Sequence, residues 1–262
     1  MTLEARSLSF GYRKPVLRDL TLRFEPGRIA LIVGPNGSGK STLLRLLLGL
    51  LDPSDTGVCT LAGRPVHALT PARRAEHLAY VPHHPHVGYA YTVRQYVSFA
   101  LASRAPASDA IEAALDQIEL RDLGDVPIAE LSAGQTQRAS IARALAQITT
   151  SSASPRFLLA DEPTSALDPR HVGQVLSIFR RLADRGVGVV LTMHDLAAAG
   201  SIADDVSVLD SEGRLEAQGP PEVVLVPGVL ERVFRTTFGV VESQGCRVIV
   251  RRDHHPEAAA IR

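Results

Sequence analysis

One segment limits what this chain can fold into more than any other: GPNGSGKST at residues 34–42. It follows a short apolar run at 28–33, which predicts a strand covered on both faces. It precedes an apolar stretch at 41–51, which predicts a buried helix. In a glycine-rich turn between a strand and a helix, backbone N–H groups point inward and the helix adds the positive end of its dipole. The segment therefore predicts a loop that binds phosphate groups.

The side chains of this loop have separate predicted roles. Lys40 can reach the β- and γ-phosphates of a nucleotide, and the Ser41 hydroxyl can ligate Mg²⁺. A chance glycine-rich turn would lack the strand before it and the helix after it. The candidate nucleotide-binding residues are Gly34, Pro35, Asn36, Gly37, Ser38, Gly39, Lys40, Ser41 and Thr42.

The two ends of the chain predict different kinds of β-sheet. Residues 3–10 and 16–24 alternate apolar and polar side chains, which is typical of half-buried antiparallel strands. Residues 157–160 and 187–193 are buried-strand runs on either side of a predicted helix at 169–185, an order that favours parallel pairing. We therefore predict an α/β fold: a P-loop NTPase core with a mixed or parallel sheet, and an N-terminal antiparallel β subdomain.

The middle of the chain predicts helices instead. Residues 92–103 and 109–120 are predicted helices. The second has apolar side chains at helical spacing, and its Asp109 and Glu112 are spaced as a capping box. We expect an inserted α-helical subdomain there, which ends before the polar segment SSASP at 151–155. Hairpins are expected near residues 204–218 and 240–251. The predicted organisation is one domain over 1–262, with a core of 1–83 and 151–252, an insertion at 84–150 and a disordered tail at 253–262.

Composition excludes several classes of protein. The 262 residues are 45% hydrophobic and 21% charged, which is typical of globular chains rather than disordered ones. Because 28 Lys and Arg balance 28 Asp and Glu, no global basic field favours nucleic acid or anionic lipid. The two cysteines, Cys59 and Cys246, do not suggest a disulfide framework and fit a reducing compartment.

A membrane association would have to depend on another protein. The first residues, MTLEARSLSFGY, lack the apolar core of a signal peptide. No stretch approaches the ~18 uninterrupted apolar residues that a spanning helix needs. We therefore expect any link to a membrane to go through a partner.

Two adjacent carboxylates, Asp161 and Glu162, follow the predicted strand at 157–160. In isolation such a pair is more often a solvated strand end. In a chain with a phosphate loop, we expect the pair at the same edge of the sheet, beside that loop. There Asp161 would hold Mg²⁺ through its water shell, and Glu162 would orient and polarise the attacking water.

The segment LSAGQ at 131–135 leaves two interpretations open. Ser132 and Gln135 have the spacing of a capping box at the start of a helix. Alternatively, the helix start is a second anion site, with the Ser132 hydroxyl and the Gly134 N–H directed at a γ-phosphate. Taken by itself, the segment favours the cap.

Four motifs occur in order along the chain: GPNGSGKST, LSAGQ, LLADEPTSALD, and LTMHD with His194. Together they resemble the nucleotide-binding subunits of ATP-binding-cassette (ABC) transporters. The resemblance extends from about residue 3 to residue 250, nearly the whole chain. It implies ATP as the nucleotide, Mg²⁺ as the metal ion, and ATP hydrolysis that involves Lys40, Glu162 and His194.

The resemblance also implies roles that the residues alone do not establish. Tyr12 would stack on adenine, and His194 would be a switch near the γ-phosphate. A signature motif that closes over ATP on a second copy of the subunit would be formed by Ser132, Ala133, Gly134 and Gln135. Asp168 would communicate across that dimer. Taken alone, Tyr12 could equally be a packing residue, and His194 a structural one.

Two positions depart from the family pattern. The family usually has Gln after a segment like YVP, where it contacts Mg²⁺ or water and couples to the membrane partner; here the position is His83. An imidazole can still form one hydrogen bond or ligate a metal. The second departure is Ala133, where Gly is usual, and it is tolerable if the backbone there has a negative φ.

The histidines of the HHPH segment offer a different chemistry. His83, His84 and His86 could bind a transition metal, although no cysteine or carboxylate accompanies them. Pro82 and Pro85 favour an exposed loop. We therefore prefer the interpretation without a metal.

The resemblance predicts a transporter motor. Two copies of the subunit would bind two ATP molecules between them on the cytoplasmic face of the inner membrane, as peripheral subunits. They would dock beneath separate permease subunits through the loop at residues 83–91 and nearby helices. A substrate-binding protein outside the cytoplasm would deliver the cargo. The segment between the signature helix and the acidic strand resembles subunits for heme, iron-siderophore or cobalamin uptake.

Other functions remain open at this point. The cargo could be another small nutrient or a metal ion, because the ATPase residues do not distinguish cargoes. A DNA-repair or translation ATPase of the same class would need a long coiled coil or a second cassette, and the sequence has neither. A catalytically silent regulator would lack Lys40 or Glu162, and both are present.

Overall fold

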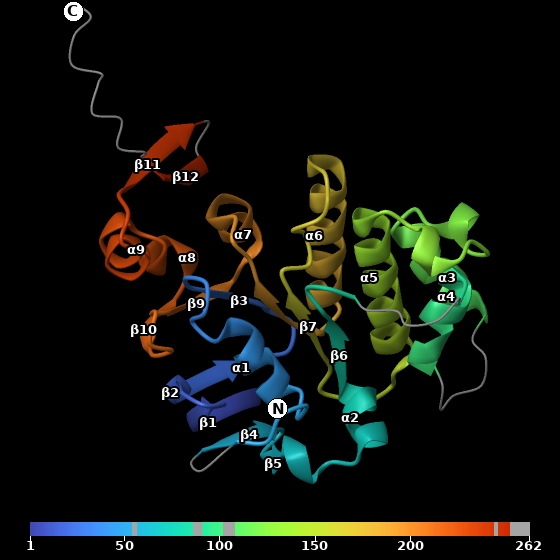
Figure 1. The fold of residues 1–262 in the computed structure, drawn as a ribbon, viewed down its shortest axis with the longest axis horizontal. Helices are drawn as coiled ribbons and strands as arrows, with labels where there is room; N and C mark the ends of the chain where they lie inside the picture. Colours follow the sequence, from blue (N-terminus) through green and yellow to red (C-terminus); the bar gives the residue numbers. More distant parts are fainter. Residues whose placement is uncertain (54–56, 86–90, 102–107, 244–245, 252–262) are drawn as a thin grey trace, which may run out of the picture.

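The computed structural model describes residues 1–53, 57–85, 91–101, 108–243 and 246–251 (Figure 1). The strands are β1 (Leu3–Gly11), β2 (Pro15–Phe24), β3 (Ile29–Val33), β4 (Val58–Leu61), β5 (Arg64–Pro65), β6 (Leu78–Val81), β7 (Phe157–Asp161), β8 (Gly188–Thr192), β9 (Asp205–Leu209), β10 (Leu215–Gly219), β11 (Phe238–Ser243) and β12 (Cys246–Arg251). The helices are α1 (Lys40–Leu47), α2 (Pro71–His77), α3 (Val93–Ser98), α4 (Ser108–Gln117), α5 (Ala133–Thr150), α6 (Pro169–Asp184), α7 (Leu196–Ile202), α8 (Pro221–Val224) and α9 (Pro227–Phe234). Short 3₁₀ turns lie at Val66–Ala68, Phe99–Leu101, Arg121–Leu123 and Ile128–Glu130.

The central sheet has six strands in the order β10-β9-β3-β8-β7-β6. All neighbours pair in parallel except β10, which runs antiparallel to β9 at one edge. Helix α6 connects β7 to β8 as a crossover, which allows these two buried strands to pair in parallel. The predicted mixed, mainly parallel sheet is confirmed.

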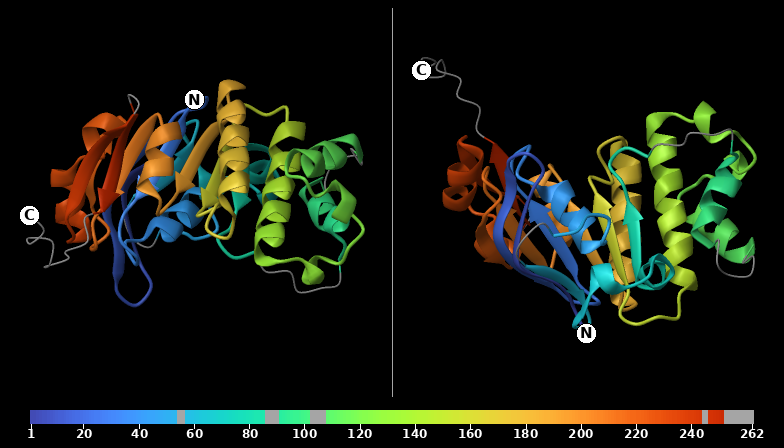
Figure 2. Two further views of the ribbon diagram at one scale, coloured as in Figure 1. Left: turned by 90° about the horizontal axis from the view of Figure 1, so that it is seen from above. Right: turned by 60° about the horizontal axis from the view of Figure 1, so that its bottom comes forward.

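The N-terminal strands form a separate antiparallel sheet in the order β2-β1-β4-β5. Helix α1 lies between the two sheets, and its leucines pack against both (Figure 2). Leu43, Leu44 and Leu47 are completely buried. Arg45 is exposed, while the other residues of α1 are buried or partly buried, so the helix keeps only a narrow solvated strip and its leucines pack on both sides.

The helical part consists of α3, α4 and α5, which lie beyond β6 and β7, on the right in Figure 1. Helix α5 packs against α3 and α4 and joins them to the core through its buried face. The predicted helices in the middle of the chain are present, although the predicted cap at Asp109 is wrong. Asp109 lies within the first turn of α4, and Glu112 forms ion pairs with Arg94 and Arg121.

The C-terminal part ends in the antiparallel hairpin of β11 and β12, as expected. The predicted disordered tail at 253–262 lies outside the described residues. In the part of the chain that the structure describes, no helix combines the length and the apolar character that crossing a bilayer requires.

Candidate nucleotide-binding site

Four neighbouring strands bring the predicted site residues to one edge of the sheet. In the order β3, β8, β7 and β6, their carboxyl ends lead into the phosphate loop, His194, Asp161 with Glu162, and His83. Ligands of open α/β sheets bind at this edge. The acidic pair is separated from the phosphate loop by one strand, β8, rather than lying on the adjacent strand.

The phosphate loop turns sharply into α1. Gly39 has a φ of 91° at the N-cap of α1, and a Cβ there would lie 2.4 Å from Leu17 Cδ2. Only glycine satisfies both conditions. Lys40 is the first residue of α1 and is only 6% exposed. Its Nζ donates to the backbone oxygens of Gly34 (2.8 Å) and Pro35 (3.1 Å).

The charge of Lys40 is sensitive to its surroundings. Burial lowers the pKa of Lys40, and the carboxylates of Glu162 and Asp161 act in the opposite direction. The Lys40 ammonium is thus close enough to Glu162 and Asp161 for their negative charges to act on its pKa. A buried cation held by carbonyl oxygens is well placed to exchange those partners for phosphate oxygens.

The loop also contains a polar atom that lacks a partner. Ser38 Oγ is buried and forms no hydrogen bond among the described residues. A buried hydroxyl without a partner is costly, and a phosphate oxygen would satisfy it. The other loop residues leave the loop surface open to a ligand. Asn36 and Gly37 are exposed, and Pro35, Gly39 and Ser41 are partly buried, while Thr42 is buried.

The acidic pair is held by Thr192. Asp161 pairs in register with Thr192, whose hydroxyl donates to Asp161 Oδ1 at 2.7 Å. The same hydroxyl accepts the backbone N–H of Glu162 at 2.9 Å. Asp161 is 2% exposed, and its other oxygen has no hydrogen bond among the described residues. A buried carboxylate with one hydrogen bond from the protein suits a cation or the water shell of a cation, so Asp161 fits its predicted role.

Glu162 turns away from the line of the strand. Its φ of 46° is unusual for a residue with a side chain and costs about 1–2 kcal/mol. This turn places the carboxylate between two imidazoles: His194 Nε2 lies 2.7 Å from Oε1, and His83 Nε2 lies 3.4 Å from Oε2. The structure therefore joins Glu162 and His194, and it adds His83 to them.

The signature segment begins helix α5. Ser132 Oγ accepts the backbone N–H of Gln135, and Gln135 Oε1 accepts the backbone N–H of Ser132. The predicted capping box is confirmed. Ala133 is exposed and does not have a positive φ, so its methyl group is tolerated. No hydrogen bond or ion pair joins residues 132–135 to residues 34–42 in the described structure.

Gly134 connects the signature segment to the segment before α6. A Cβ on Gly134 would lie 2.8 Å from the backbone oxygen of Ala166. Two residues farther on, Asp168 caps α6 by accepting from the His171 N–H at 3.1 Å, and its Oδ2 lies 2.6 Å from His171 Nδ1. The His171 side chain, followed by its backbone N–H, lowers the pKa of Asp168. Asp168 therefore has a local structural role in addition to the role that the resemblance implies.

Tyr12 is available to a ligand. It is 60% exposed, and its ring meets Phe10 edge to face at a centroid distance of 5.0 Å. Its side chain lies near Arg45 of α1: burial lowers the pKa of Arg45, but Tyr80 and Tyr12 raise it by more. The Tyr12 face is thus held near α1 without being covered.

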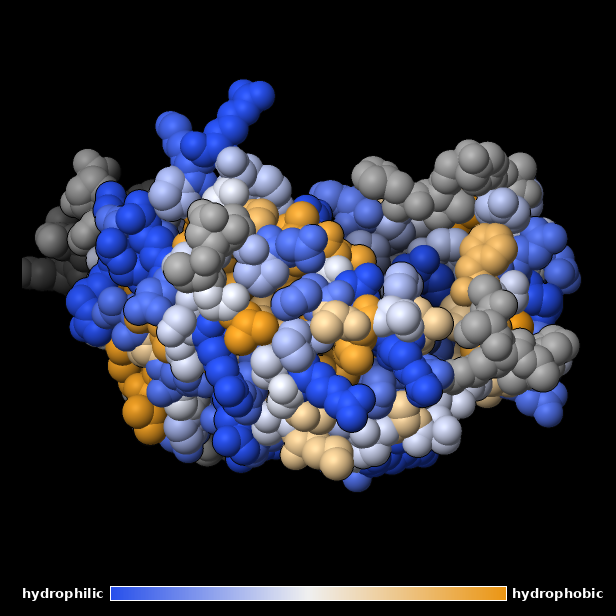
Figure 3. Space-filling model, turned by 90° about the horizontal axis from the view of Figure 1, so that it is seen from below, coloured by the Kyte–Doolittle hydropathy of each residue, from blue (hydrophilic) through white to orange (hydrophobic). Residues whose placement is uncertain are grey.

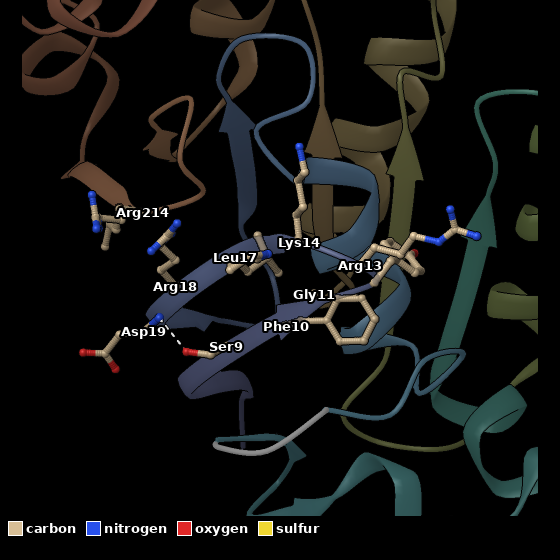
Figure 4. Close-up of a pocket in the computed structure, with 12 residues that line it drawn as sticks. Ser9, Phe10, Gly11, Arg13, Lys14, Leu17, Arg18, Asp19 and Arg214 are labelled. Carbon is tan, nitrogen blue, oxygen red and sulfur yellow. Dashed lines mark hydrogen bonds between the residues drawn. The ribbon is translucent and has the colours of Figure 1, made fainter.

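An open pocket of about 1000 Å³ adjoins Tyr12 (Figure 4). Arg18 and Arg214 lie at one end of the view, and Arg13 lies at the other. With Lys14, these cations outnumber Asp19 among the side chains that line the pocket. The local charge suits a polyanion, although the net charge of the whole chain is zero.

The predicted histidine cluster lies only partly within the described residues. His83 and His84 stack on each other at a centroid distance of 3.9 Å, and His86 lies outside the described residues. No group of three or more His, Cys, Asp or Glu side chains in the described ranges could hold a metal ion.

Two residues of the site were not expected from the sequence. Thr192 orients both acids. The only sequence feature that indicates this role is the position of Thr192 at the end of a buried strand, just before Met193 and His194. Gln137 is 1% exposed, and its Nε2 donates to the Pro82 backbone oxygen at 3.3 Å, which connects α5 to the residue before His83. A polar residue on the buried face of a predicted helix is the signal for Gln137.

Comparison with known proteins agrees with this geometry. A family model described as ABC transporter matches residues 17–165. The hemin import ATP-binding protein HmuV of Rhodopseudomonas palustris (strain BisA53) is 40% identical and aligns over 91% of this chain and 89% of its own. HmuV of Pseudomonas entomophila (strain L48) is 40% identical over 84% of this chain and 86% of its own.

Solved structures share the fold. An ATP-binding subunit of an ABC transporter has a TM-score of 0.76 at 26% identity and covers 90% of this chain and 94% of its own. A structure described as a metal-chelate type ABC transporter in an inward-facing conformation has a TM-score of 0.77 at 26% identity, over 97% of this chain and 98% of its own. The chain therefore belongs to the ABC transporter family and carries the ATPase domain of that family.

Proposed function

We propose that this protein is the ATP-hydrolysing motor subunit of an importer of heme or a related iron chelate. The observation that carries the enzymatic part is the position of Glu162, whose carboxylate lies 2.7 Å from His194 at the sheet edge where Lys40 and Asp161 also meet. The relatives named above supply the cargo class, because their names state hemin import.

The chain's own residues divide the work in hydrolysis. Lys40 leaves the Gly34 and Pro35 oxygens and binds the β- and γ-phosphates. Glu162 orients a water molecule for attack on the γ-phosphate and takes up its proton, while His194 holds the carboxylate and reaches the γ-phosphate. Ser41 and Asp161 would hold Mg²⁺, which supplies charge neutralisation at the phosphates when it is bound.

We further propose that the working unit is a homodimer. No hydrogen bond or ion pair joins residues 132–135 to residues 34–42 within the described chain, which is consistent with a nucleotide contact made on another copy. The N-terminus of α5 would clamp the γ-phosphate of that partner's ATP through Ser132 and Gly134. Hydrolysis replaces these contacts with repulsion and opens the dimer. Asp168 would carry the signal between the two sites.

A groove beside the helical part supports a docking site for the permease. It has a volume of about 320 Å³ and is lined by residues of the α1 end, α2 and α5. Leu50 and Phe99 line the groove and are 59% and 45% exposed, so together they offer apolar surface to a partner. Figure 3 shows the molecule from the side on which α2 lies, where apolar groups are exposed between charged ones.

The proposed organisation follows from these assignments. Residues 1–83 and 151–252 would form the ATP-binding core, and 84–150 the helical signature subdomain. The subunit would lie on the cytoplasmic face of the inner membrane, bound peripherally to permease subunits. A substrate-binding protein on the other side would deliver the cargo. Cobalamin, another small nutrient or a metal ion is the alternative cargo, and a non-transport ATPase of the same class is the alternative function.

Transport in proteoliposomes tests the proposal. The subunit is combined with a candidate permease and a substrate-binding protein, and uptake of hemin, a ferric siderophore and cobalamin is measured with and without ATP. We expect ATP-dependent hemin uptake that Lys40→Ala abolishes. ATP hydrolysis with uptake of only cobalamin or a siderophore would contradict the hemin assignment, and hydrolysis that no permease affects would contradict transport.

A further inference from the structure

We infer that His83 is a positioning residue for Glu162, and that it holds the second carboxylate oxygen through its Nε2 atom. The inference rests on the proposed function and refines it, because it gives the unusual histidine a task within the ATPase reaction. His83 contacts another side chain and is not assigned a contact with ATP.

The contact joins two side chains of different exposure. The Glu162 side chain is 14% exposed, whereas the His83 and His194 side chains are 34% and 48% exposed. His194 Nε2 faces Oε1 at 2.7 Å, and His83 Nε2 faces Oε2 at 3.4 Å. Each oxygen of the carboxylate thus has its own imidazole. His194 is therefore the closer partner of the carboxylate, and His83 is the second.

The sheet register explains why His83 reaches Glu162. Strands β6 and β7 pair in parallel with Val81 opposite Ala160. His83 lies two residues after Val81, and Glu162 lies two residues after Ala160. Both residues therefore follow their strands at the same level of the sheet. The pairing of two buried strands sets this level, and the left-handed turn at Glu162 directs its side chain toward His83.

Two further contacts hold the His83 region. The Gln137 amide donates to the backbone oxygen of Pro82 at 3.3 Å, so helix α5 fixes the residue before His83. The His84 ring stacks on the His83 ring at 3.9 Å with an interplanar angle of 25°. The Gln137 contact restricts the backbone that carries the His83 imidazole. An oriented donor loses less conformational entropy when it holds a partner.

The carboxylate needs two anchors for a physical reason. Glu162 starts from a left-handed backbone, and its side chain has three rotatable bonds before the reacting oxygens. One donor fixes one oxygen but leaves rotation about the axis through it. A second donor on the other oxygen fixes the carboxylate plane, which determines where a water molecule can be held.

The chemistry of the position allows a matched set of variants. A Gln side chain places its amide nitrogen near the position of an imidazole Nε2, whereas Asn places its amide nitrogen near Nδ1. Because His83 faces Glu162 through Nε2, His83→Gln should keep the contact and His83→Asn should lose it. His83→Leu removes every donor, and His84→Gln is a control in the neighbouring residue that keeps a planar group.

Steady-state ATP hydrolysis of the purified protein separates these variants. We expect His83→Asn and His83→Leu to lower kcat by ~10-fold or more with KM for ATP changed by less than ~2-fold, because the lost contact acts on the water-activating group. His83→Gln and His84→Gln should stay within ~3-fold of the parent. Equal activity of His83→Gln, His83→Asn and His83→Leu would overturn the inference.

Imidazole ¹⁵N NMR of the nucleotide-free protein provides a measurement that does not need turnover. Glu162→Gln should shift the Nε2 resonances of both His83 and His194, while His84 stays in place. An unchanged His83 resonance would overturn the inference even if the protein is an active ATPase. If the parent hydrolyses no ATP, the proposed function fails, and the NMR result alone then decides whether His83 holds Glu162.

Discussion

The hydroxyl of Thr192 lies between the two acids of the site, donating to Asp161 Oδ1 at 2.7 Å and accepting the Glu162 N–H at 2.9 Å. Thr192 is completely buried at the end of β8. The Thr192 side chain therefore orients the Asp161 carboxylate, which is proposed to hold Mg²⁺. It also fixes the backbone turn at Glu162, which is proposed to activate water. A shared partner of this kind couples two functional groups that lie next to each other in the sequence.

Thr192→Val should impair both folding and hydrolysis. The methyl group fills the space of the hydroxyl, but Asp161 then loses its protein hydrogen bond in a buried place. We expect a loss of ~1.5–3 kcal/mol in unfolding free energy, as for hydrogen bonds to charged groups, together with a fall in kcat. Chemical denaturation and ATPase assays measure the two effects. Thr192→Ser keeps the hydroxyl and should retain more of both, and a stable, fully active Thr192→Val would contradict the coupling.

Glu162→Gln should abolish turnover while ATP still binds. The amide keeps the size of the side chain and a contact for His194, but it cannot take up a proton from water. Loss of a general base lowers rates by ~10²–10⁴-fold. Single-turnover hydrolysis and nucleotide binding are measured on the same preparation. Normal turnover of Glu162→Gln would assign the base to another residue.

The two small residues of the signature segment should respond differently to substitution. Gly134→Ala puts a Cβ 2.8 Å from the Ala166 backbone oxygen, so one of two backbone segments must move. We expect a loss of ~1–3 kcal/mol from overpacking, which exceeds the gain of up to ~1 kcal/mol in helix propensity. Ala133→Gly, at an exposed neighbouring position, should cost less than ~1 kcal/mol. Thermal unfolding compares them, and equal stability of the two variants would argue against close contact at Gly134.

Asp168 should titrate below its ordinary pKa of 3.8, chiefly because the His171 side chain stabilises its carboxylate. Since the folded-state pKa is lowered, this contribution to stability is present above about pH 3.8. It is lost as the pH falls through the lower, folded-state pKa. A ¹³C NMR titration of the Asp168 carboxyl gives the pKa. His171→Ala should return it toward 3.8, and an unchanged value would show that the cap alone causes the shift.

The parts of the site that are encoded by adjacent residues were predictable from the sequence. The phosphate loop was recognised because its strand and helix are its immediate neighbours. The capping box of Ser132 and Gln135 depends on a spacing of three residues, and it is present. The cap predicted at Asp109 has the same spacing, but α4 begins one residue earlier, at Ser108, so spacing alone does not locate a helix start.

The parts that depend on strand order and register were not predictable. A single sequence does not state that β8 lies between β3 and β7, which separates the acids from the phosphate loop by one strand. It does not state that Thr192 lies opposite Asp161, or that β6 brings His83 to Glu162. These relationships arise between segments far apart in the chain. The left-handed turn at Glu162 is equally hidden, because nothing in the residue type favours a φ of 46°.

The central claim is that ATP bound by Lys40 in one copy is clamped by Ser132 of another. Sedimentation velocity of the Glu162→Gln variant with Mg²⁺ tests it directly, with and without ATP. We predict monomers without ATP, dimers with ATP, and monomers again when Ser132→Arg or Lys40→Ala is added. A Glu162→Gln protein that binds ATP and remains monomeric at every ATP concentration would contradict the account.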